Sequence, residues 1–587
     1  MTAIDIPSAA APSSAHPLPA AVAEREASRA RPALLAWWAV LLIVGALQAW
    51  SARHYVNPDG VSYLDLSDRA AAGRWGQAIS SYWSPLLPWL LGLAVRLVRP
   101  SPYFEATLAH LVLYATYVSS AASFEFLRRE LSRRAAWLWS PFGIAVSYTL
   151  FVWSGIALVG LEKLTPDPLV AAVVFAATAL LLRAERGVGG GRTYVMLGAT
   201  LGVGYWAKAA LFPAAFAFLA AAAVAAWRSG RAGSGKAHPR GPSAGAVSRA
   251  LLALLAFALV AAPLVVALSV AKGAPTFGEV GRLAYGWFVN GYPQFWWTGE
   301  PAGSGSPVHP IRQLMQEPRV FEFGGEVEGT YPLWLDPSYW YQGLAVRMAP
   351  LRQLDRLLRG VRDYVALFGV LVGLSLLPAV ISGGAGGVVR AARRAAVAVL
   401  PAVAMLGLYA LVLVESRYVA APAVVLCLAL LAASLPLESL RQPTARAAAL
   451  SAGGAVMLVA GVTLAPLVAP TLRALWQQAR DGEAAHRDWV IARHLREAGV
   501  RPGDAVGTIS GTTMLAYWPR AAGVRVVAEA PDDPRSWEAV GRVTATLFAA
   551  GVRAVVLDPA YRPPGPAPAG AGWVSLGDTG YAVRLNR

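Results

Sequence analysis

Long apolar runs dominate the chain, and each is long enough to cross a bilayer as a helix, which takes about 20 residues. They lie at 33–50, 103–127, 136–158, 168–184, 193–208, 209–227, 250–271, 363–383, 395–414, 419–435 and 447–468. A further run, 85–98, is shorter and contains Arg96, which favours an interfacial helix over a span. The pattern predicts a mainly α, polytopic membrane protein with about eleven transmembrane helices.

Basic residues along the chain predict the topology. With the N-terminus in the cytoplasm and 85–98 at the interface, every short, strongly basic loop falls on the cytoplasmic side, as the positive-inside rule requires. These loops carry Arg128, Arg129, Arg133, Arg134, Arg183, Arg186, Arg192, Arg228, Arg231, Lys236, Arg240, Arg249, Arg390, Arg393, Arg394, Arg441 and Arg446. The outer side then holds the loops 51–102 and 272–362, the turn 159–167 and the C-terminus. We expect a protein of the cytoplasmic (inner) membrane with an extracytoplasmic C-terminal domain.

Three regions follow from these patterns. Residues 1–31 are rich in Ala, Ser and Pro and are typical of a disordered cytoplasmic tail. Residues 32–470 form the transmembrane domain, and 471–587 change to alternating short apolar runs and helical patterns. This alternation predicts a small α/β domain, with strands at 505–509, 524–528 and 552–557 and helices at 483–498 and 534–550. It has no Gly-rich phosphate loop, so nothing favours nucleotide binding.

Composition and charge agree with this picture. Of the 587 residues only 14% are charged, against about 25% in soluble domains, and the mean hydropathy is +0.47. The net charge of +17 lies largely in the predicted cytoplasmic loops, which argues against a nucleic-acid partner. The single cysteine, Cys427, excludes an intrachain disulfide, and the scattered histidines argue against a His/Cys zinc site. Among them only His54, five residues before Asp59, stays a candidate.

The first outer loop carries the most informative acidic residue. Asn57 is a good N-cap and Pro58 suits the first helical position, so Asp59 falls in the first turn of an interfacial helix. Backbone N–H groups there favour the ionised carboxylate, which could accept a proton from a hydroxyl. The alternative is an acid that only complements the helix dipole. Asp65 and Arg69 stand four residues apart and are expected to pair.

Other polar and aromatic residues fall on the same predicted face. Tyr82 and Trp83 open a second interfacial helix, where their alternative role is membrane anchoring. Asp167 lies in the outer turn and could bind a metal or orient a substrate together with Asp59, or merely start the next helix. Lys208 stands between two apolar runs, either snorkelling or binding an anionic headgroup.

Two further groups lie on the outer side. Glu415, Arg417 and Tyr418 occupy a very short turn, where Arg417 suits phosphate contact or a local ion pair with Glu415. The loop 272–362 is rich in aromatic residues, some of which are expected to anchor at the interface. They include Trp287, Phe295, Trp296, Trp297, Trp334 and Trp340.

Together these short patterns resemble the GT-C superfamily of integral-membrane glycosyltransferases, over about residues 33–470. The similarity is greatest to the branch with the lipid A aminoarabinose transferases, the galacturonosyltransferases and the protein O-mannosyltransferases. The patterns are Asp59-Gly60 with Tyr63, Trp83-Ser84-Pro85-Leu86, Thr165-Pro166-Asp167 and Glu415-Ser416-Arg417-Tyr418.

The resemblance implies an inverting transfer from a polyprenyl-phosphate sugar to a lipid, glycan or protein acceptor, with membrane lipids as surroundings. It places the catalytic base on Asp59 and a divalent cation, as the candidate cofactor, between Asp59 and Asp167. It assigns substrate binding to Tyr63, Tyr82, Trp83, Asp167, Lys208, Glu415, Arg417 and Tyr418, with Lys208 and Arg417 toward the lipid phosphate. The O-mannosyltransferases have an Asp-Glu pair where this chain has Asp59-Gly60, which argues against a protein acceptor.

Two other functions stay open on the sequence. A transporter or flippase of lipid-linked intermediates would show broken spans and ionisable residues near the midplane. Here the acidic residues of interest lie at the outer membrane edge, which favours surface chemistry. A non-catalytic assembly protein with a GT-C-like fold is the second alternative, and substitution of Asp59 distinguishes it from an enzyme.

Overall fold

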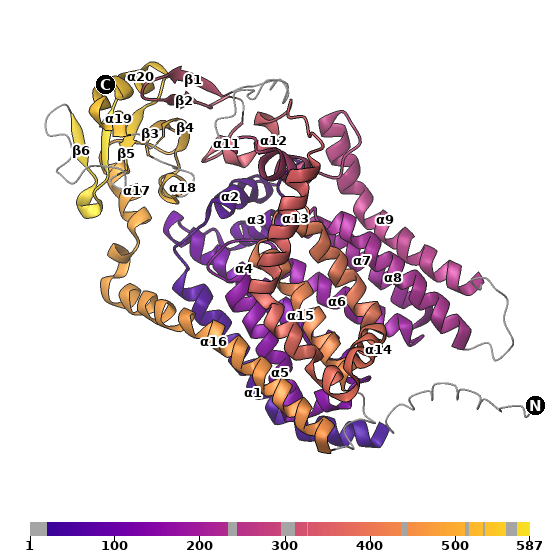
Figure 1. Cartoon of the computed structure of the whole chain (residues 1–587). Coiled ribbons are helices and arrows are strands. Elements are labelled where there is room, and N and C mark those ends of the chain that lie inside the picture. The colour runs from indigo at the N-terminus through magenta and orange to yellow at the C-terminus, as the bar shows by residue number, and fades with distance from the viewer. Residues whose placement is uncertain are drawn as a thin grey trace, which may run out of the picture.

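Long helices run side by side through most of the molecule, and short helices and a small sheet gather at one end of them (Figure 1). This computed structural model describes residues 20–232, 244–294, 311–325, 327–435, 443–510, 516–531, 534–558 and 572–586.

Eight helices among the described residues are long and apolar enough to cross a membrane. They are built from α1 (Ala20–Ser51), α5 (Pro141–Val152) with η4 (Trp153–Val159), α6 (Asp167–Glu185), α8 (Leu211–Ala232), α9 (Ala244–Lys272), α13 (Pro350–Tyr364) with η6 (Val365–Gly369) and α14 (Val370–Ala410), α15 (Ser416–Ser434), and α16 (Pro443–Asp481) with the segments after it. Two more long helices, α4 (Glu105–Ser132) and α7 (Gly190–Ala207), pack against α6 and α9. The predicted mainly α, polytopic fold is confirmed.

The helix α14 supplies two of the predicted runs because it is folded back on itself. Gly383 and Gly384 leave the helical conformation, and the φ of +53° at Gly384 is one that glycine adopts without strain. A Cβ atom placed on Gly387 would lie 2.0 Å from the carbonyl oxygen of Ala379. Eight residues along a straight helix span about 12 Å, so the two arms face each other across this turn.

Ion pairs gather the basic loops at the end of the bundle opposite the sheet. Glu185, at the end of α6, pairs with Arg134 after α4 and with Arg228 of α8, and Glu130 pairs with Arg186. Three of the loops predicted to be cytoplasmic therefore lie at one end of the molecule. The side of the membrane that this end faces stays a prediction.

The N-terminal region differs from the expected tail at 1–31. Residues 1–19 lie outside the described residues, but α1 already begins at Ala20. The stretch from Ala20 to Arg31 consists mostly of Ala, Glu and Arg, which are strong helix formers, so the helix begins before the apolar span Ala30–Ser51.

The C-terminal region forms a mixed seven-stranded sheet in the order β1-β2-β4-β3-β5-β7-β6. Its strands are β1 (Arg312–Met315), β2 (Val320–Glu322), β3 (Ala505–Ile509), β4 (Arg525–Ala530), β5 (Ala554–Leu557), β6 (Trp573–Ser575) and β7 (Ala582–Leu585). Its helices are α17 (Arg487–Glu497), α18 (Trp518–Ala522), α19 (Pro534–Glu538) and α20 (Val540–Ala549). The central strand β3 runs parallel to β4 and β5, the three strands foreseen in the sequence.

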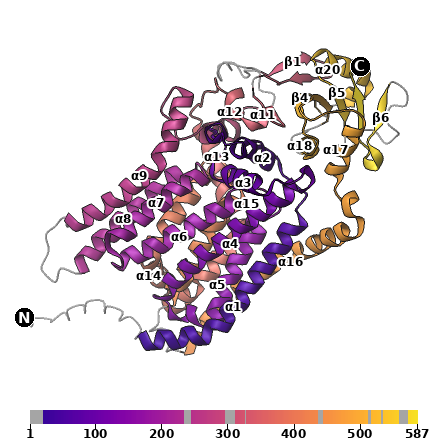
Figure 2. The ribbon, with the colours of Figure 1, turned by 180° about the vertical axis from the view of Figure 1, so that it is seen from behind.

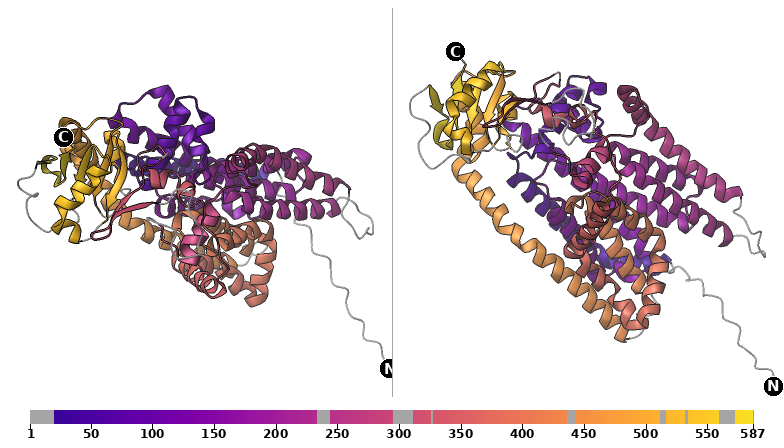
Figure 3. Two further views of the ribbon diagram at one scale, coloured as in Figure 1. Left: turned by 90° about the horizontal axis from the view of Figure 1, so that it is seen from above. Right: turned by 45° about the horizontal axis from the view of Figure 1, so that its top comes forward.

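Two features of this domain were not foreseen. The strands β1 and β2 come from the long outer loop and pair antiparallel with β4. The helix α16 also runs through the expected boundary at 470 and ends at Asp481. The views in Figure 3 keep the sheet at the end of α16, beside the short helices of the first outer loop.

Short elements cover the bundle at this end (Figure 2). They are α2 (Pro58–Ala71), α3 (Leu86–Val98), α10 (Val280–Tyr285) with η5 (Gly286–Asn290), α11 (Pro332–Leu335) and α12 (Pro337–Trp340). The remaining short turns are η1 (Trp75–Ala78), η2 (Pro102–Phe104), η3 (Ala136–Trp139), η8 (Gly482–Ala485) and η11 (Gly577–Thr579). The predicted interfacial helix at 85–98 corresponds to α3.

Candidate active site

The first turn of α2 holds Asp59 close to the turn before α6. Asn57 is the extended N-cap residue and Pro58 the first helical residue, as the sequence indicates. The Asn57 side chain accepts a hydrogen bond from the Leu164 N–H at 2.8 Å, which joins α2 to this turn. A Cβ atom on Gly60 would lie 2.9 Å from the Cβ of Leu164. Since a side chain has no room there, close packing explains why glycine follows Asp59.

Asp167 begins α6 and is almost fully buried, with 2% of its surface exposed. Lys208, which follows the last residue of α7, places Nζ 2.6 Å from Asp167 Oδ1. The same Nζ lies 3.6 Å from the ring centre of Tyr418, a cation–π distance. Lys208 therefore points at an acidic residue and an aromatic ring rather than away along the helix surface.

Arg417 connects the two acidic residues. It lies in the first turn of α15, with Nη2 2.9 Å from Asp59 Oδ2 and Nε 3.8 Å from Asp167 Oδ2. The guanidinium also lies 5.1 Å from the ring centre of Tyr418. Its partners are thus Asp59 and Asp167, rather than Glu415 at the N-cap of the same helix.

A cavity of about 620 Å³ opens beside this cluster. Its lining includes every residue to which the resemblance assigns catalysis or substrate binding, namely Asp59, Tyr63, Tyr82, Trp83, Asp167, Lys208, Glu415, Arg417 and Tyr418. They come from the first outer loop, the start of α6, the end of α7 and the start of α15, four segments far apart in the chain. The fold thus brings the predicted residues to one place.

Aromatic rings form another part of the cavity lining. Tyr82 lies 4.6 Å from Trp83 and 5.8 Å from Trp334 between ring centres, and Trp334 stacks on Trp287 at 6.2 Å. Trp83 donates a hydrogen bond to the Leu335 carbonyl at 2.9 Å, which holds the outer loop against the turn before α3. Trp287 and Trp334 were expected only as membrane anchors. Their aromatic-rich loop was the signal, but it has no periodicity that indicates a cavity.

Other expected aromatic residues of this loop fall elsewhere. Trp340 is buried and donates a hydrogen bond to the Pro332 carbonyl at 3.1 Å, so it packs inside the outer loop. Phe295, Trp296 and Trp297 lie outside the described residues.

A second cluster joins the C-terminal domain to α2. Arg520 of α18 lies 2.9 Å from Asp65 Oδ1, 2.6 Å from Asp68 Oδ2 and 2.5 Å from Glu105 Oε1. Asp65 also accepts two hydrogen bonds of 2.8 Å from the N–H and hydroxyl of Thr330. Burial raises the pKa of Asp65 even though Arg520 opposes this shift. The domain and the outer loop together hold the middle of α2.

Two expectations for the first loop differ from the structure. The predicted Asp65–Arg69 pair is wrong, because Asp65 faces Arg520 while Arg69 donates to the carbonyls of Gln77 and Glu328, each at 3.0 Å. His54 does not line the cavity; its ring lies 3.6 Å from that of His486, centre to centre.

The acidic pair does not fit a divalent cation. The described residues contain no group of three His, Cys, Asp or Glu side chains able to hold a metal ion. The carboxylates of Asp59 and Asp167 instead contact Arg417, and Asp167 also contacts Lys208. These two cations already compensate the acidic charge that a metal would need.

No model of a known protein family matches the chain, and neither does any curated protein sequence. Among solved structures, it is similar to ArnT from Cupriavidus metallidurans bound to undecaprenyl phosphate. The identity is 13% and the TM-score 0.48, over 93% of this chain and 97% of that one. For the apo state of ArnT the identity is 13% and the TM-score 0.46, over 89% of this chain and 93% of that one.

A more distant likeness is to an oligosaccharyltransferase from Archaeoglobus fulgidus tethered with an acceptor peptide. There the identity is 12% and the TM-score 0.38, over 89% of this chain and 69% of that one. These proteins belong to the GT-C superfamily, the one that the sequence patterns resemble. At such low identities and TM-scores, the function has to be argued from the chain's own residues.

Proposed function

We propose that this chain is a membrane glycosyltransferase that moves a sugar from a polyprenyl-phosphate donor to an acceptor hydroxyl on the extracytoplasmic face. The observation that carries the proposal is the Asp59–Arg417 ion pair, 2.9 Å long, at the wall of a cavity of about 620 Å³. It sets a carboxylate, which suits a proton acceptor, beside a guanidinium, which suits phosphate oxygens, where a substrate has room. Aromatic rings elsewhere in the lining offer flat apolar surfaces.

The two cations suit the leaving group. A polyprenyl phosphate departs as an anion, and fixed positive charges stabilise that charge as it develops. Arg417 offers a planar fork that matches phosphate oxygens, and Lys208 adds a second charge. A bound donor phosphate competes with Asp59 for Arg417. Donor binding thereby loosens the ion pair and frees the carboxylate to act as a base.

The proposed step is a single displacement. The acceptor oxygen attacks the anomeric carbon and forms the new glycosidic bond. The bond from that carbon to the phosphate oxygen breaks, and its electron pair leaves with the lipid phosphate. The hydroxyl proton passes to Asp59. Attack opposite to the leaving group inverts the anomeric configuration. Lipid and glycan hydroxyls suit this chemistry as acceptors; a protein hydroxyl does too, but the Asp59-Gly60 sequence argues against it.

The test is sugar transfer by the purified full-length protein with Asp59→Asn, which keeps the shape of the side chain but cannot take up the proton. Transfer is expected to fall about 100- to 10,000-fold, the usual contribution of a general base. Asp355→Asn is the matched control, because Asp355 pairs with Arg359 on the exposed surface of α13, outside the cavity lining.

The alternatives predict different results. Undiminished transfer by both Asp59→Asn and Asp59→Ala would remove Asp59 from the reaction. If the protein moved lipid-linked sugars across vesicles without transferring them, the transporter alternative would hold instead. A protein with neither activity would be the non-catalytic assembly factor.

A further inference from the structure

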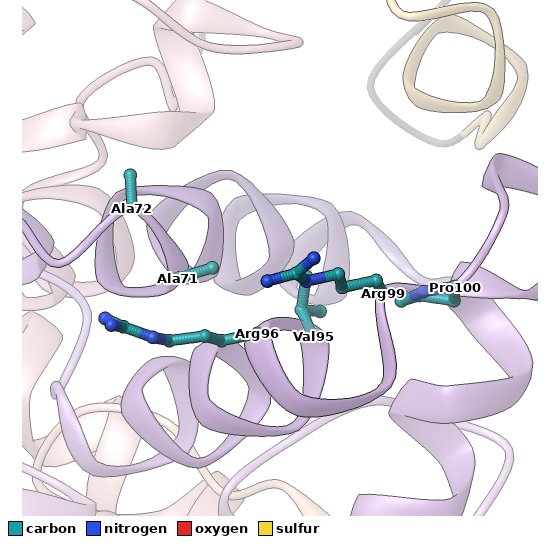
Figure 4. Close-up of a pocket in the computed structure, with 6 residues that line it drawn as sticks. All are labelled: Ala71, Ala72, Val95, Arg96, Arg99 and Pro100. Atoms are coloured by element: carbon teal, nitrogen blue, oxygen red, sulfur yellow. The ribbon is translucent and has the colours of Figure 1, made fainter.

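A second hollow lies between α2 and α3, at the end of α2 away from Asp59 (Figure 4). It is shallow and largely open to the surroundings, and its lining consists of Ala71, Ala72, Val95, Arg96, Arg99 and Pro100, of which Arg96 and Arg99 are exposed. Twelve residues separate Asp59 from Ala71, which is about 18 Å along a helix. A ligand here therefore lies apart from the candidate active site.

Two guanidinium groups point into this hollow. Figure 4 shows the Arg96 and Arg99 side chains extending into the space between the two helices, with Ala71 facing them. The φ of +51° at Arg99 turns the chain at the end of α3. Within the described part of the chain, neither guanidinium has a hydrogen bond or an ion pair, unlike those of Arg417 and Arg520. Two positive charges therefore share a site that no acidic side chain of the described residues lines or pairs with.

The surroundings of the hollow are those of a membrane interface. On α3 the exposed fractions of Leu93, Leu97 and Val98 are 46%, 74% and 61%, so the helix presents an apolar surface outward. Nearby, the rings of Trp75 and Trp89 meet edge to face at 5.8 Å, and such aromatic residues gather at headgroup depth. The two arginines thus stand where the apolar surface of an interfacial helix ends.

We propose that the hollow between α2 and α3 binds the phosphate headgroup of an anionic membrane lipid. The forks of Arg96 and Arg99 match the phosphate oxygens, and among the described residues no acidic side chain lines the hollow to compete for them. Leu97 and Val98 continue from the hollow as a surface for the acyl chains. The bound lipid fixes α2 and α3 to the membrane surface, whatever reaction the cavity catalyses.

The experiment measures lipid binding to the full-length protein in detergent by native mass spectrometry, with phosphatidylglycerol and phosphatidylcholine as probes. Arg96→Gln with Arg99→Gln is expected to weaken phosphatidylglycerol binding about 25-fold, about fivefold for each arginine near an anionic lipid surface. Phosphatidylcholine binding stays unchanged. Arg501→Gln with Arg542→Gln removes the same charge from exposed positions in the C-terminal domain and is the matched control.

The proposal fails if the Arg96/Arg99 variant binds phosphatidylglycerol as tightly as the wild type, or loses no more affinity than the control. It also fails if inorganic phosphate displaces the lipid as readily as added phosphatidylglycerol does, because the site would then take a free anion. If the glutamine variant does not fold, Arg96→Lys with Arg99→Lys replaces it. Lysine keeps the charge without the fork, so affinity is expected to fall several-fold, and unchanged affinity contradicts the proposal.

Discussion

Two arginines meet acidic residues of the same short helix, α2, in different surroundings. Arg417 pairs with Asp59 at the start of α2, and Arg520 pairs with Asp65 and Asp68 further along it. Their side chains are similarly exposed, 17% and 12%, so burial does not distinguish them. The difference is that Arg417 borders a cavity of about 620 Å³, whereas Arg520 is enclosed between α2, α4 and α18.

Arg520 therefore forms a structural ion-pair cluster, whereas Arg417 forms an ion pair that a ligand can exchange. Arg520 has three carboxylates around it, and no ligand is needed to complete its environment. Arg417 can give up Asp59 to an anion that enters the cavity. Because the C-terminal domain holds the middle of α2, the first turn of the helix presents Asp59 to the cavity from a fixed position.

The largest effect is expected from Arg520→Met. It leaves Asp65, Asp68 and Glu105 near one another without their common cation, and breaking a buried pair in this way costs about 3–5 kcal/mol. The unfolding temperature in detergent should fall well below that of the wild type, with Arg501→Met as an exposed control. Wild-type stability in Arg520→Met would show that this cluster does not stabilise the fold.

The next effect is expected in activity rather than stability. Arg417→Gln should lower transfer about 100- to 1,000-fold, or about 2.7–4 kcal/mol, the loss typical when one donor to a developing anion is removed. Its unfolding temperature should stay close to that of the wild type, since the cavity admits water to Asp59 and Lys208 still pairs with the buried Asp167. Arg359→Gln, on the exposed face of α13, is the control. A loss of stability as large as that of Arg520→Met would remove the contrast between the two arginines.

The sequence indicated the residues around the cavity better than the ion-pair cluster of Arg520, for a physical reason. The start of α2 follows from local rules at Asn57, Pro58 and Asp59, and the topology placed Asp59, Asp167 and Arg417 on one face. The partner of Asp65 is 455 positions away, so the nearer Arg69 at helical spacing was favoured wrongly.

The long outer loop was the other part that local rules missed. Its strands β1 and β2 have only four and three residues, too short to show alternation in the sequence. Trp334 reaches the cavity through contacts with α2 and with the turn before α3, where Ser62 and Trp83 both donate hydrogen bonds to its carbonyl at 3.2 Å. Such contacts depend on tertiary packing rather than on sequence spacing.

A smaller effect concerns pH at the same domain junction. Burial, with help from the nearby His486, Arg53 and His110, lowers the pKa of His54 to about 3. Between the ordinary pKa of about 6.5 and this value, the unfolded chain binds a proton that the folded chain does not. Stability is therefore complete above the unfolded pKa and decreases as the pH falls toward 3.

We expect a loss of about 1 kcal/mol between pH 7 and pH 5, after allowance for the partial exposure of the ring. The unfolding temperature at the two pH values measures it. His54→Phe keeps the ring contact with His486 and removes the titration, so its stability should depend less on pH. Equal pH dependence in both proteins would assign the effect to other groups.

The smallest effect on the transfer rate is expected from the removal of divalent ions. This experiment tests whether Arg417, unlike Arg520, gives up its acidic partner to a ligand. If Arg417 and Lys208 supply the positive charge for the leaving phosphate, EDTA should leave the transfer rate about the same as without it. A metal that served as the Lewis acid would instead make transfer depend on its presence. Should EDTA abolish transfer and Mg²⁺ or Mn²⁺ restore it, the ion would have to bind Asp59 and Asp167 and displace Arg417 from both. Arg417 would then occupy the position of the metal in its absence. The ligand that breaks the Asp59–Arg417 ion pair would be a metal ion that replaces Arg417, rather than a donor phosphate that replaces Asp59.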